Sequence, residues 1–196
     1  FDKGTIVMPV NRRGCGKCIN CLIGRPDFCE TGDFREAGIK GMHGFMRSFI
    51  MDDPAFLVKG PDDIIDMAIM AQPLSDLEKS VEEMVDVQRR LHWKCLDNTY
   101  NCRHILVVGT STIGILFSML LKTYGFDVSI ANRRDETDRE KKIFEELGIR
   151  YVNSSRGYSS DKKYDGIIET SGSDASILEN LIPLINYNGF LGLFGF

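Results

Sequence analysis

Four cysteines lie close together near the start of the chain, in the spacing Cys-x2-Cys-x2-Cys-x7-Cys. Zinc favours four thiolates in a tetrahedron, and two-residue gaps allow a tight turn to direct successive sulfurs at one point. The longer gap lets the chain return with the fourth ligand. Because four thiolates leave no position for water, the quartet predicts a structural zinc site, with the ligands Cys15, Cys18, Cys21 and Cys29.

Other interpretations of the cysteines stay open. An iron–sulfur run of the bacterial type has three residues before its last cysteine and a proline after it, whereas seven residues precede Cys29 and Glu30 follows it. Free or disulfide-linked thiols are a further alternative. Cys95 and Cys102 lack His or Asp partners at metal-ligand spacing, so we interpret them as incidental or as a local disulfide.

A second motif is the loop Gly109-Thr-Ser-Thr-Ile-Gly114, which follows the apolar run 105–108 and precedes a helical pattern. This strand–loop–helix setting is typical of a dinucleotide-binding loop. Ser111 replaces the middle glycine, which normally lets the backbone approach the pyrophosphate, although its hydroxyl can donate to a phosphate. The alternative is a tight turn without a ligand.

Asn132, Arg133 and Arg134 follow the next predicted strand. An NAD-specific site usually has Asp or Glu here, whereas guanidinium groups suit phosphate oxygens. We therefore expect a contact with the 2′-phosphate of NADP, with NAD also accepted; the alternative is a solvated basic patch that balances the acids at 135, 136 and 138. The predicted cofactor-binding residues are Gly109, Thr110, Ser111, Thr112, Ile113, Gly114, Asn132, Arg133, Arg134 and Thr170.

The elements that must position these residues form two regions. Up to residue 60 we expect strands over 4–10, 45–50 and 55–58 around an irregular cysteine lobe at 11–41. Helices follow over 62–71 and 74–91, then a polar insertion at 92–103 that is a hairpin or a loose loop. From residue 104 strands alternate with helices: strands over 105–108, 128–131, 149–152, 164–169 and 190–194, helices over 113–124, 138–147 and from Ser173 toward Ile185, and a Ser-rich loop over 153–163.

This alternation predicts an α/β fold with a doubly wound parallel sheet. We place a first domain at 1–74 and a second at 75–196. A net charge of −4 argues against a nucleic-acid binder, and no apolar run approaches the roughly 18–20 residues that span a bilayer. With no signal-peptide pattern, we expect a cytoplasmic protein with mostly reduced thiols. The chain starts without Met and stops inside an apolar run, so we expect a fragment of a longer protein.

A cysteine lobe followed by a doubly wound nucleotide domain resembles the zinc-containing medium-chain dehydrogenases, and within them the archaeal glucose dehydrogenase branch. The stretches that carry the resemblance are Val7–Arg13, Cys21–Cys29, Glu36–Gly38, Gly44–Arg47, Ala71–Leu74, Asn132–Arg134 and Leu191–Gly195. The resemblance implies an incomplete Rossmann-type domain preceded by part of a GroES-like β domain. It also implies a homotetramer.

The implied reaction is oxidation of the C1 hydroxyl of an aldose such as D-glucose to the lactone, with hydride passing to NADP or NAD. The resemblance places Gln72 at a catalytic zinc, directly or through water, with Glu36 close to it as a second catalytic residue. It assigns the sugar hydroxyls to Asn11, Glu36, Gln72 and Asp76. Judged by the residues alone, Glu36 could be merely solvated and Gln72 only a helix-end cap.

The family's catalytic zinc also needs an upstream Cys and His, which this chain does not contain, so the chain alone is not expected to support full catalysis. Two alternatives remain. One is a medium-chain dehydrogenase that acts on another sugar, alcohol or polyol. The other is a non-catalytic NADP-binding protein that senses redox state through its thiols.

Overall fold

The computed structural model describes residues 1–158 and 163–195. The chain divides into two compact units, Phe1–Met70 and Ala71–Phe196, and each is considered by itself. None of the helices in the described residues is long and apolar enough to span a membrane.

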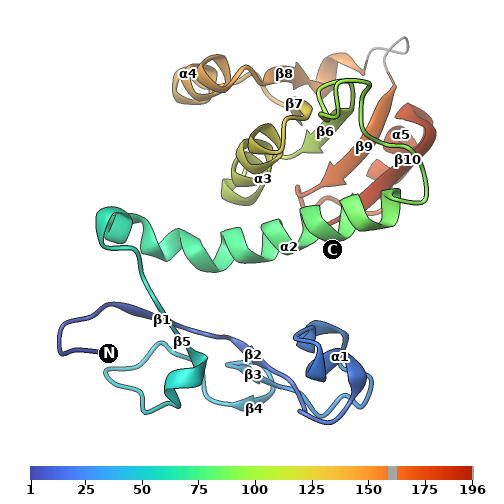
Figure 1. Cartoon of the computed structure of the whole chain (residues 1–196). Helices are drawn as coiled ribbons and strands as arrows, with labels where there is room; N and C mark the ends of the chain where they lie inside the picture. Colours follow the sequence, from blue (N-terminus) through green and yellow to red (C-terminus); the bar gives the residue numbers. More distant parts are fainter. Residues whose placement is uncertain (159–162, 196) are drawn as a thin grey trace. The chain divides into compact units, whose positions relative to one another are not determined.

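The first unit is built from short strands around the cysteine lobe (Figure 1). Strands β1 (Val7–Pro9) and β5 (Leu57–Lys59) pair antiparallel. A second sheet joins β2 (Arg12–Arg13), β3 (Arg35–Ala37) and β4 (Gly41–Met42), and the lobe carries the one-turn helix α1 (Ile19–Leu22). The prediction of a strand over 45–50 is wrong, because this stretch has no regular structure.

The strand predicted over 55–58 is only partly right, because a 3₁₀ turn occupies Pro54–Phe56 and the strand begins at Leu57. The Asp53 carboxylate accepts a hydrogen bond of 2.9 Å from the Ala55 amide, and Pro54 fixes the first helical position. An Asp cap followed by proline favours a helical turn over an extended start.

The second unit contains a parallel sheet of five strands in the order β10-β9-β6-β7-β8 among the residues described. The strands are β6 (His104–Val108), β7 (Asp127–Asn132), β8 (Arg150–Asn153), β9 (Tyr164–Glu169) and β10 (Ile185–Leu193). From β6 the chain adds β7 and β8 on one side, then crosses to add β9 and β10 on the other. This confirms the doubly wound prediction and creates a topological switch point between β6 and β9.

Helices cover both faces of this sheet (Figure 1). They are α2 (Ala71–Gln88), α3 (Thr112–Thr123), α4 (Asp138–Leu147) and α5 (Ile177–Leu181). Side chains of α2, α3 and α4 pack on one face against Ile105, Val107 and Ile130, whereas α5 and the turn after it pack on the other against Leu106 and Ile167. The alternation of Ile105, Leu106 and Val107 between the two faces explains why the strand is apolar throughout.

Two helix predictions need correction. Residues 62–70 form a 3₁₀ stretch broken at Ile64 instead of an α-helix, and α2 begins at Ala71. The long helix from Ser173 toward Ile185 is wrong, because α5 has only five residues. The Asp174 side chain accepts from the Ser176 amide at 2.8 Å, a local turn that competes with helix before Ile177. Part of the predicted loop, 159–162, lies outside the described residues.

Candidate functional site

The cysteine quartet converges in the first unit. The Sγ atoms of Cys15, Cys18, Cys21 and Cys29 all lie within 4.8 Å of one another. The backbone folds tightly round them: a Cβ added at Gly14 would lie 2.6 Å from the Cys21 Sγ. Zn–S bonds of about 2.3 Å in a tetrahedron place sulfurs about 3.8 Å apart, so a small contraction would close this group round zinc. The donor set therefore fits a zinc ion with no open position.

Hydrogen bonds lower the pKa of two of these thiols, Cys15 and Cys29. The amides of Lys17 and Cys18 each donate to the Cys15 Sγ at 3.4 Å. A hydrogen bond from Thr31, together with these amides, lowers the pKa of Cys15 to about 6, and Thr31 also lowers the pKa of Cys29. Burial and a hydrogen bond with Cys18 raise the pKa of Cys21 to about 12. Zinc binds thiolates, so binding must displace the proton of Cys21.

The first and last glycines of the loop allow the tight turn and the close helix–strand packing of a dinucleotide-binding loop. Gly109 has φ +112°, and a Cβ there would lie 2.9 Å from the Thr170 Oγ1. A Cβ at Gly114 would lie 2.0 Å from the Gly109 carbonyl oxygen. Ser111 is the N-cap of α3, since its Oγ accepts from the Gly114 amide at 3.4 Å. The amides of the first turn have no acceptor within the helix and favour an anion.

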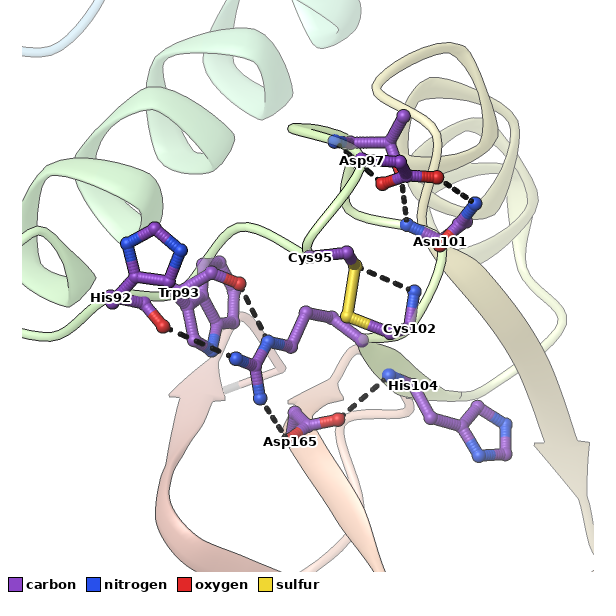
Figure 2. Close-up of a disulfide and its surroundings, with 10 residues drawn as sticks. His92, Trp93, Cys95, Asp97, Asn101, Cys102, His104 and Asp165 are labelled. Carbon is purple, nitrogen blue, oxygen red and sulfur yellow. Dashed lines mark hydrogen bonds and ion pairs between the residues drawn. A yellow bond between two sulfur atoms is a disulfide. The ribbon is translucent and has the colours of Figure 1, made fainter.

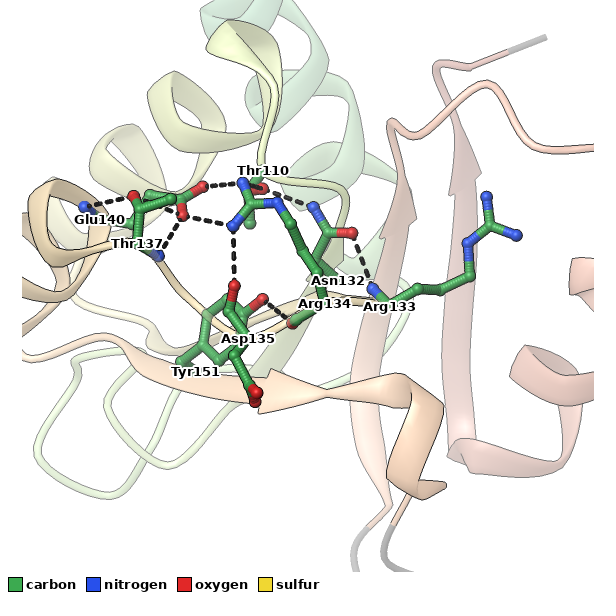
Figure 3. Close-up of polar contacts among 8 residues, drawn as sticks. All are labelled: Thr110, Asn132, Arg133, Arg134, Asp135, Thr137, Glu140 and Tyr151. Atoms are coloured by element: carbon green, nitrogen blue, oxygen red, sulfur yellow. Dashed lines mark hydrogen bonds and ion pairs between the residues drawn. The ribbon is translucent and has the colours of Figure 1, made fainter.

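The basic residues after β7 behave differently from one another. Figure 3 shows the Arg134 side chain turned toward Glu140 and Thr110, whereas Arg133 extends away from them. Arg134 forms two bonds to the Glu140 carboxylate, of 2.7 and 2.6 Å. Within the described residues Arg133 has no hydrogen bond or ion pair through its guanidinium. Hydrogen bonds from Ser176 lower the pKa of Asp174, and the charge of Arg133 adds to this effect. Asn132 is held by its Nδ2, which donates to the Thr110 Oγ1 at 2.6 Å.

A pocket of about 230 Å³ opens at the carboxyl ends of β6 to β9, where a doubly wound sheet places its ligand. Gly109, Thr110 and Ser111 of the glycine loop line it with Asn132 and Arg133. Six further lining residues were missed by the sequence analysis: Val108, Ala131, Ser154, Ser171, Ser173 and Ile177. Val108, Ala131, Ser154 and Ser171 could have been found from their place at or next to the end of a parallel strand, whereas Ile177 begins α5 and had no such signal.

Thr170, a predicted cofactor-binding residue, directly follows β9 and is buried. Its amide and its hydroxyl both donate to the Val108 carbonyl, each at 2.9 Å. These bonds join the ends of β6 and β9, so the Thr170 hydroxyl hydrogen is not available to a nucleotide. Its Oγ1 instead lies so close to the loop that a Cβ at either Gly109 or Gly114 would be 2.9 Å from it.

Asn11 and Glu36 lie in the first unit, where the Ala37 amide donates to the Asn11 carbonyl at 3.0 Å. Glu36 is not merely solvated: it lies on β3, and Arg12 donates to its Oε2 at 3.1 and 2.6 Å. Gln72 and Asp76 lie one turn apart on α2 in the second unit, joined by a bond of 2.7 Å from Nε2 to Oδ2. Of the four residues predicted to bind the sugar, Asn11 thus lies beside the strand of Glu36 in the first unit, and Gln72 is bonded to Asp76 in the second.

The insertion between α2 and β6 is closed by a disulfide, Cys95–Cys102 (Figure 2). Of the alternatives left open for these cysteines, this is the local disulfide. Beside it, the Arg103 side chain donates to the carbonyls of Trp93, at 2.6 Å, and His92, at 3.3 Å. The insertion is therefore an ordered loop rather than a loose one.

Comparison with known proteins identifies relatives of both units. A family model described as the glucose dehydrogenase C-terminus matches residues 65–196. Glucose 1-dehydrogenase 1 of Picrophilus torridus is 62% identical over 194 residues, covering 99% of this chain and 54% of the relative. Glucose 1-dehydrogenase 2 of Saccharolobus solfataricus is 57% identical over 201 residues, covering 100% and 55%.

Among solved structures, the Haloferax mediterranei glucose dehydrogenase in complex with NADP, Zn and gluconolactone matches with a TM-score of 0.79 and 26% identity. The match covers 98% of this chain and 55% of that one. The chain therefore spans about half the length of the curated relatives it matches.

Proposed function

Because the chain belongs to the glucose dehydrogenase family, whose C-terminal model matches residues 65–196, we propose that the whole protein is an NAD(P)-dependent glucose 1-dehydrogenase. It removes a hydride from C1 of an aldose, with D-glucose as the main substrate, and passes the hydride to NADP or NAD to give the lactone. The observation that carries the proposal is the pocket at the switch point of the sheet, where two glycines let the loop between β6 and α3 pack closely and Arg133 lines the opening. The names of the archaeal relatives support the substrate.

In this proposal the nucleotide lies along the carboxyl ends of β6 and β7. Gly109 and Gly114 keep the loop close to the sheet, and the first amides of α3 donate to the pyrophosphate. Asn132, whose side chain is fixed on Thr110, and the guanidinium of Arg133 meet the adenosine ribose and its 2′-phosphate. The bound nicotinamide supplies the hydride acceptor.

In this proposal Asn11, Glu36, Gln72 and Asp76 bind hydroxyls of the sugar, and Glu36 and Gln72 would serve a catalytic zinc. When bound, zinc would supply Lewis-acid chemistry that eases loss of the hydroxyl proton. The hydrogen bond between Gln72 and Asp76 orients the Gln72 amide, so its carbonyl oxygen is left available as an acceptor. Arg12 fixes the direction of the Glu36 carboxylate through two hydrogen bonds to its Oε2, and a carboxylate oxygen accepts from sugar hydroxyls.

The zinc in the cysteine quartet braces its loop and takes no part in the reaction, because all four positions are thiolates. We further propose a cytoplasmic homotetramer.

Steady-state reduction of NADP and NAD by the whole protein across D-glucose, D-galactose and simple alcohols tests the proposal. Turnover of aldoses with either cofactor is the expected result. Turnover of an alcohol or polyol alone would favour a medium-chain dehydrogenase of different substrate. Nucleotide binding without turnover of any of these would refute the proposal and favour a binding role.

A further inference from the structure

Two arginines follow β7, yet the structure leaves only one of them free to meet a phosphate. All four terminal N–H groups of Arg134 already have acceptors: Nη1 donates to the Asp135 carbonyl and to Glu140, and Nη2 to Glu140 and the Thr110 Oγ1. Only its Nε–H remains. A carboxylate and a phosphate compete for the same planar fork of a guanidinium.

Glu140 is not free to move aside. Its side chain is only 9% exposed, and its Oε2 also accepts from the Thr137 amide and hydroxyl, each at 2.8 Å. The Thr137 hydroxyl in turn accepts from the Glu140 amide, completing a capping box at the start of α4. Releasing Arg134 by moving Glu140 would therefore uncap the helix, and the positive N-terminal end of that helix also favours the carboxylate in place.

We propose that Glu140 is a specificity-determining residue: by occupying the fork of Arg134 it withholds that guanidinium from the ribose 2′-phosphate. Arg133, which lines the pocket, is then the cation that meets the phosphate. Glu140 thereby limits the preference for NADP over NAD and keeps both cofactors usable. This inference rests on the proposed nucleotide site. Glu140 does not line the pocket, so it acts on cofactor preference through Arg134.

The Glu140→Gln variant isolates the effect. A glutamine can keep the capping box, because its carbonyl oxygen still accepts from Thr137, but it brings no negative charge to Arg134. The matched control is Asp138→Asn, which removes one charge from the same first turn of α4, at an exposed position outside the Arg134 network. Circular dichroism melting verifies that each variant is folded.

The experiment measures dissociation constants of adenosine 2′,5′-bisphosphate and of 5′-AMP by calorimetry, for each variant at fixed ionic strength. The ratio of the two constants reports the preference for the 2′-phosphate. We expect Glu140→Gln to raise this preference by at least about fivefold, the effect of one newly available charged donor. Asp138→Asn is expected to change it by less than about twofold, because Asp138 is exposed, where solvent and salt screen its charge, and among the described residues it makes no hydrogen bond or ion pair with Arg134.

A double variant assigns the gain to its source. In Arg134→Gln/Glu140→Gln the gain must disappear, because the proposal attributes it to the released Arg134. An unchanged or lower preference in Glu140→Gln, an equal gain in Asp138→Asn, or a gain that survives the double variant would each overturn the inference. Failure of the wild type to bind either nucleotide would overturn the proposed function as well, whereas lack of sugar turnover with binding intact would overturn the function alone.

Discussion

Gly114 lies directly over the Gly109 carbonyl, so that a Cβ at position 114 would be 2.0 Å from that oxygen. No side-chain rotation can relieve such a contact, because both partners are backbone atoms or rigidly attached to it. The close approach joins the first turn of α3 to the end of β6 and fixes the height of the loop over which a pyrophosphate would lie.

Replacing Gly114 by alanine is therefore expected to abolish NADP binding and to lower stability by about 1–3 kcal/mol or more, as overpacking does. Calorimetry and denaturant unfolding measure the two effects. Gly192→Ala is the control, since a Cβ there meets nothing closer than 3.9 Å. Normal NADP affinity in Gly114→Ala would show that the loop does not hold the nucleotide.

Replacing Arg133 by alanine should raise the KM for NADP about 10- to 100-fold and leave the KM for NAD within about twofold, because a charged hydrogen bond contributes about 1.5–3 kcal/mol. The side chain extends from the end of β7 without a hydrogen-bond partner in the part of the chain that the structure describes (Figure 3). Initial-rate kinetics with each cofactor provide the measurement. Equal changes for NADP and NAD would contradict the assignment to the 2′-phosphate.

Local signals predicted some elements closely. Helix α4 was expected over 138–147 and has those bounds, because Thr137 and Glu140 form a capping box at its start and Gly148, with φ +61°, ends it. These signals lie within a few residues of the helix and act through the backbone. A local signal also explains why the helix predicted from Ser173 is wrong. The Asp174 carboxylate accepts a hydrogen bond from the Ser176 amide, and this turn competes with a helix.

Long-range pairings could not be predicted. In the sequence Arg133 and Arg134 are equivalent neighbours, and only the structure shows that one is bound by Glu140 while the other lines the pocket. The choice depends on how the loop between β7 and α4 folds back. Likewise, spacing alone left Cys95 and Cys102 ambiguous, because a disulfide needs the three-dimensional path of the loop.

Breaking the Cys95–Cys102 disulfide is expected to lower the melting temperature by several degrees. The two cysteines are separated by seven positions, and closing a loop of this size stabilises by roughly 2–3 kcal/mol in the chain-entropy model. Thermal unfolding with and without a phosphine reductant, in zinc-saturated protein, provides the measurement. The Cys95→Ser/Cys102→Ser variant should have the lowered melting temperature both with and without the reductant. A further fall in its melting temperature on reduction would show that the reductant acts on a group other than this disulfide.

Zinc binding to the quartet should release protons at neutral pH and weaken as pH falls. Burial raises the pKa of Cys21 to about 12, so its thiol proton must leave when zinc binds, whereas Cys15, with a pKa lowered to about 6 by Thr31, is already largely ionised. Calorimetry in two buffers of different ionisation enthalpy counts the protons. Cys21→Ser should lose the zinc, and absence of proton release would contradict this description of the site.

The Arg134–Glu140 pair should make stability fall in acid. Hydrogen bonds from Arg134, and then from Thr137, lower the pKa of Glu140 from 4.5 to about 2 against the opposing effect of burial. Because the folded pKa lies below the unfolded one, the contribution is complete above about pH 4.5 and is lost as pH falls toward 2. Glu140→Gln lacks this contribution, so its melting temperature should lie below that of the wild type at neutral pH, and the gap should close across that window.

Asp138→Asn serves as the control for this titration, because it removes a carboxylate from the same turn without touching Arg134. Its melting temperature should follow the wild type through the whole acid range. A gap between Glu140→Gln and the wild type that stays constant down to the lowest pH would mean that the glutamine disturbs packing rather than an ion pair. A gap that closes shows that the start of α4 is stabilised by the charge on Glu140, and therefore by its ion pair with Arg134.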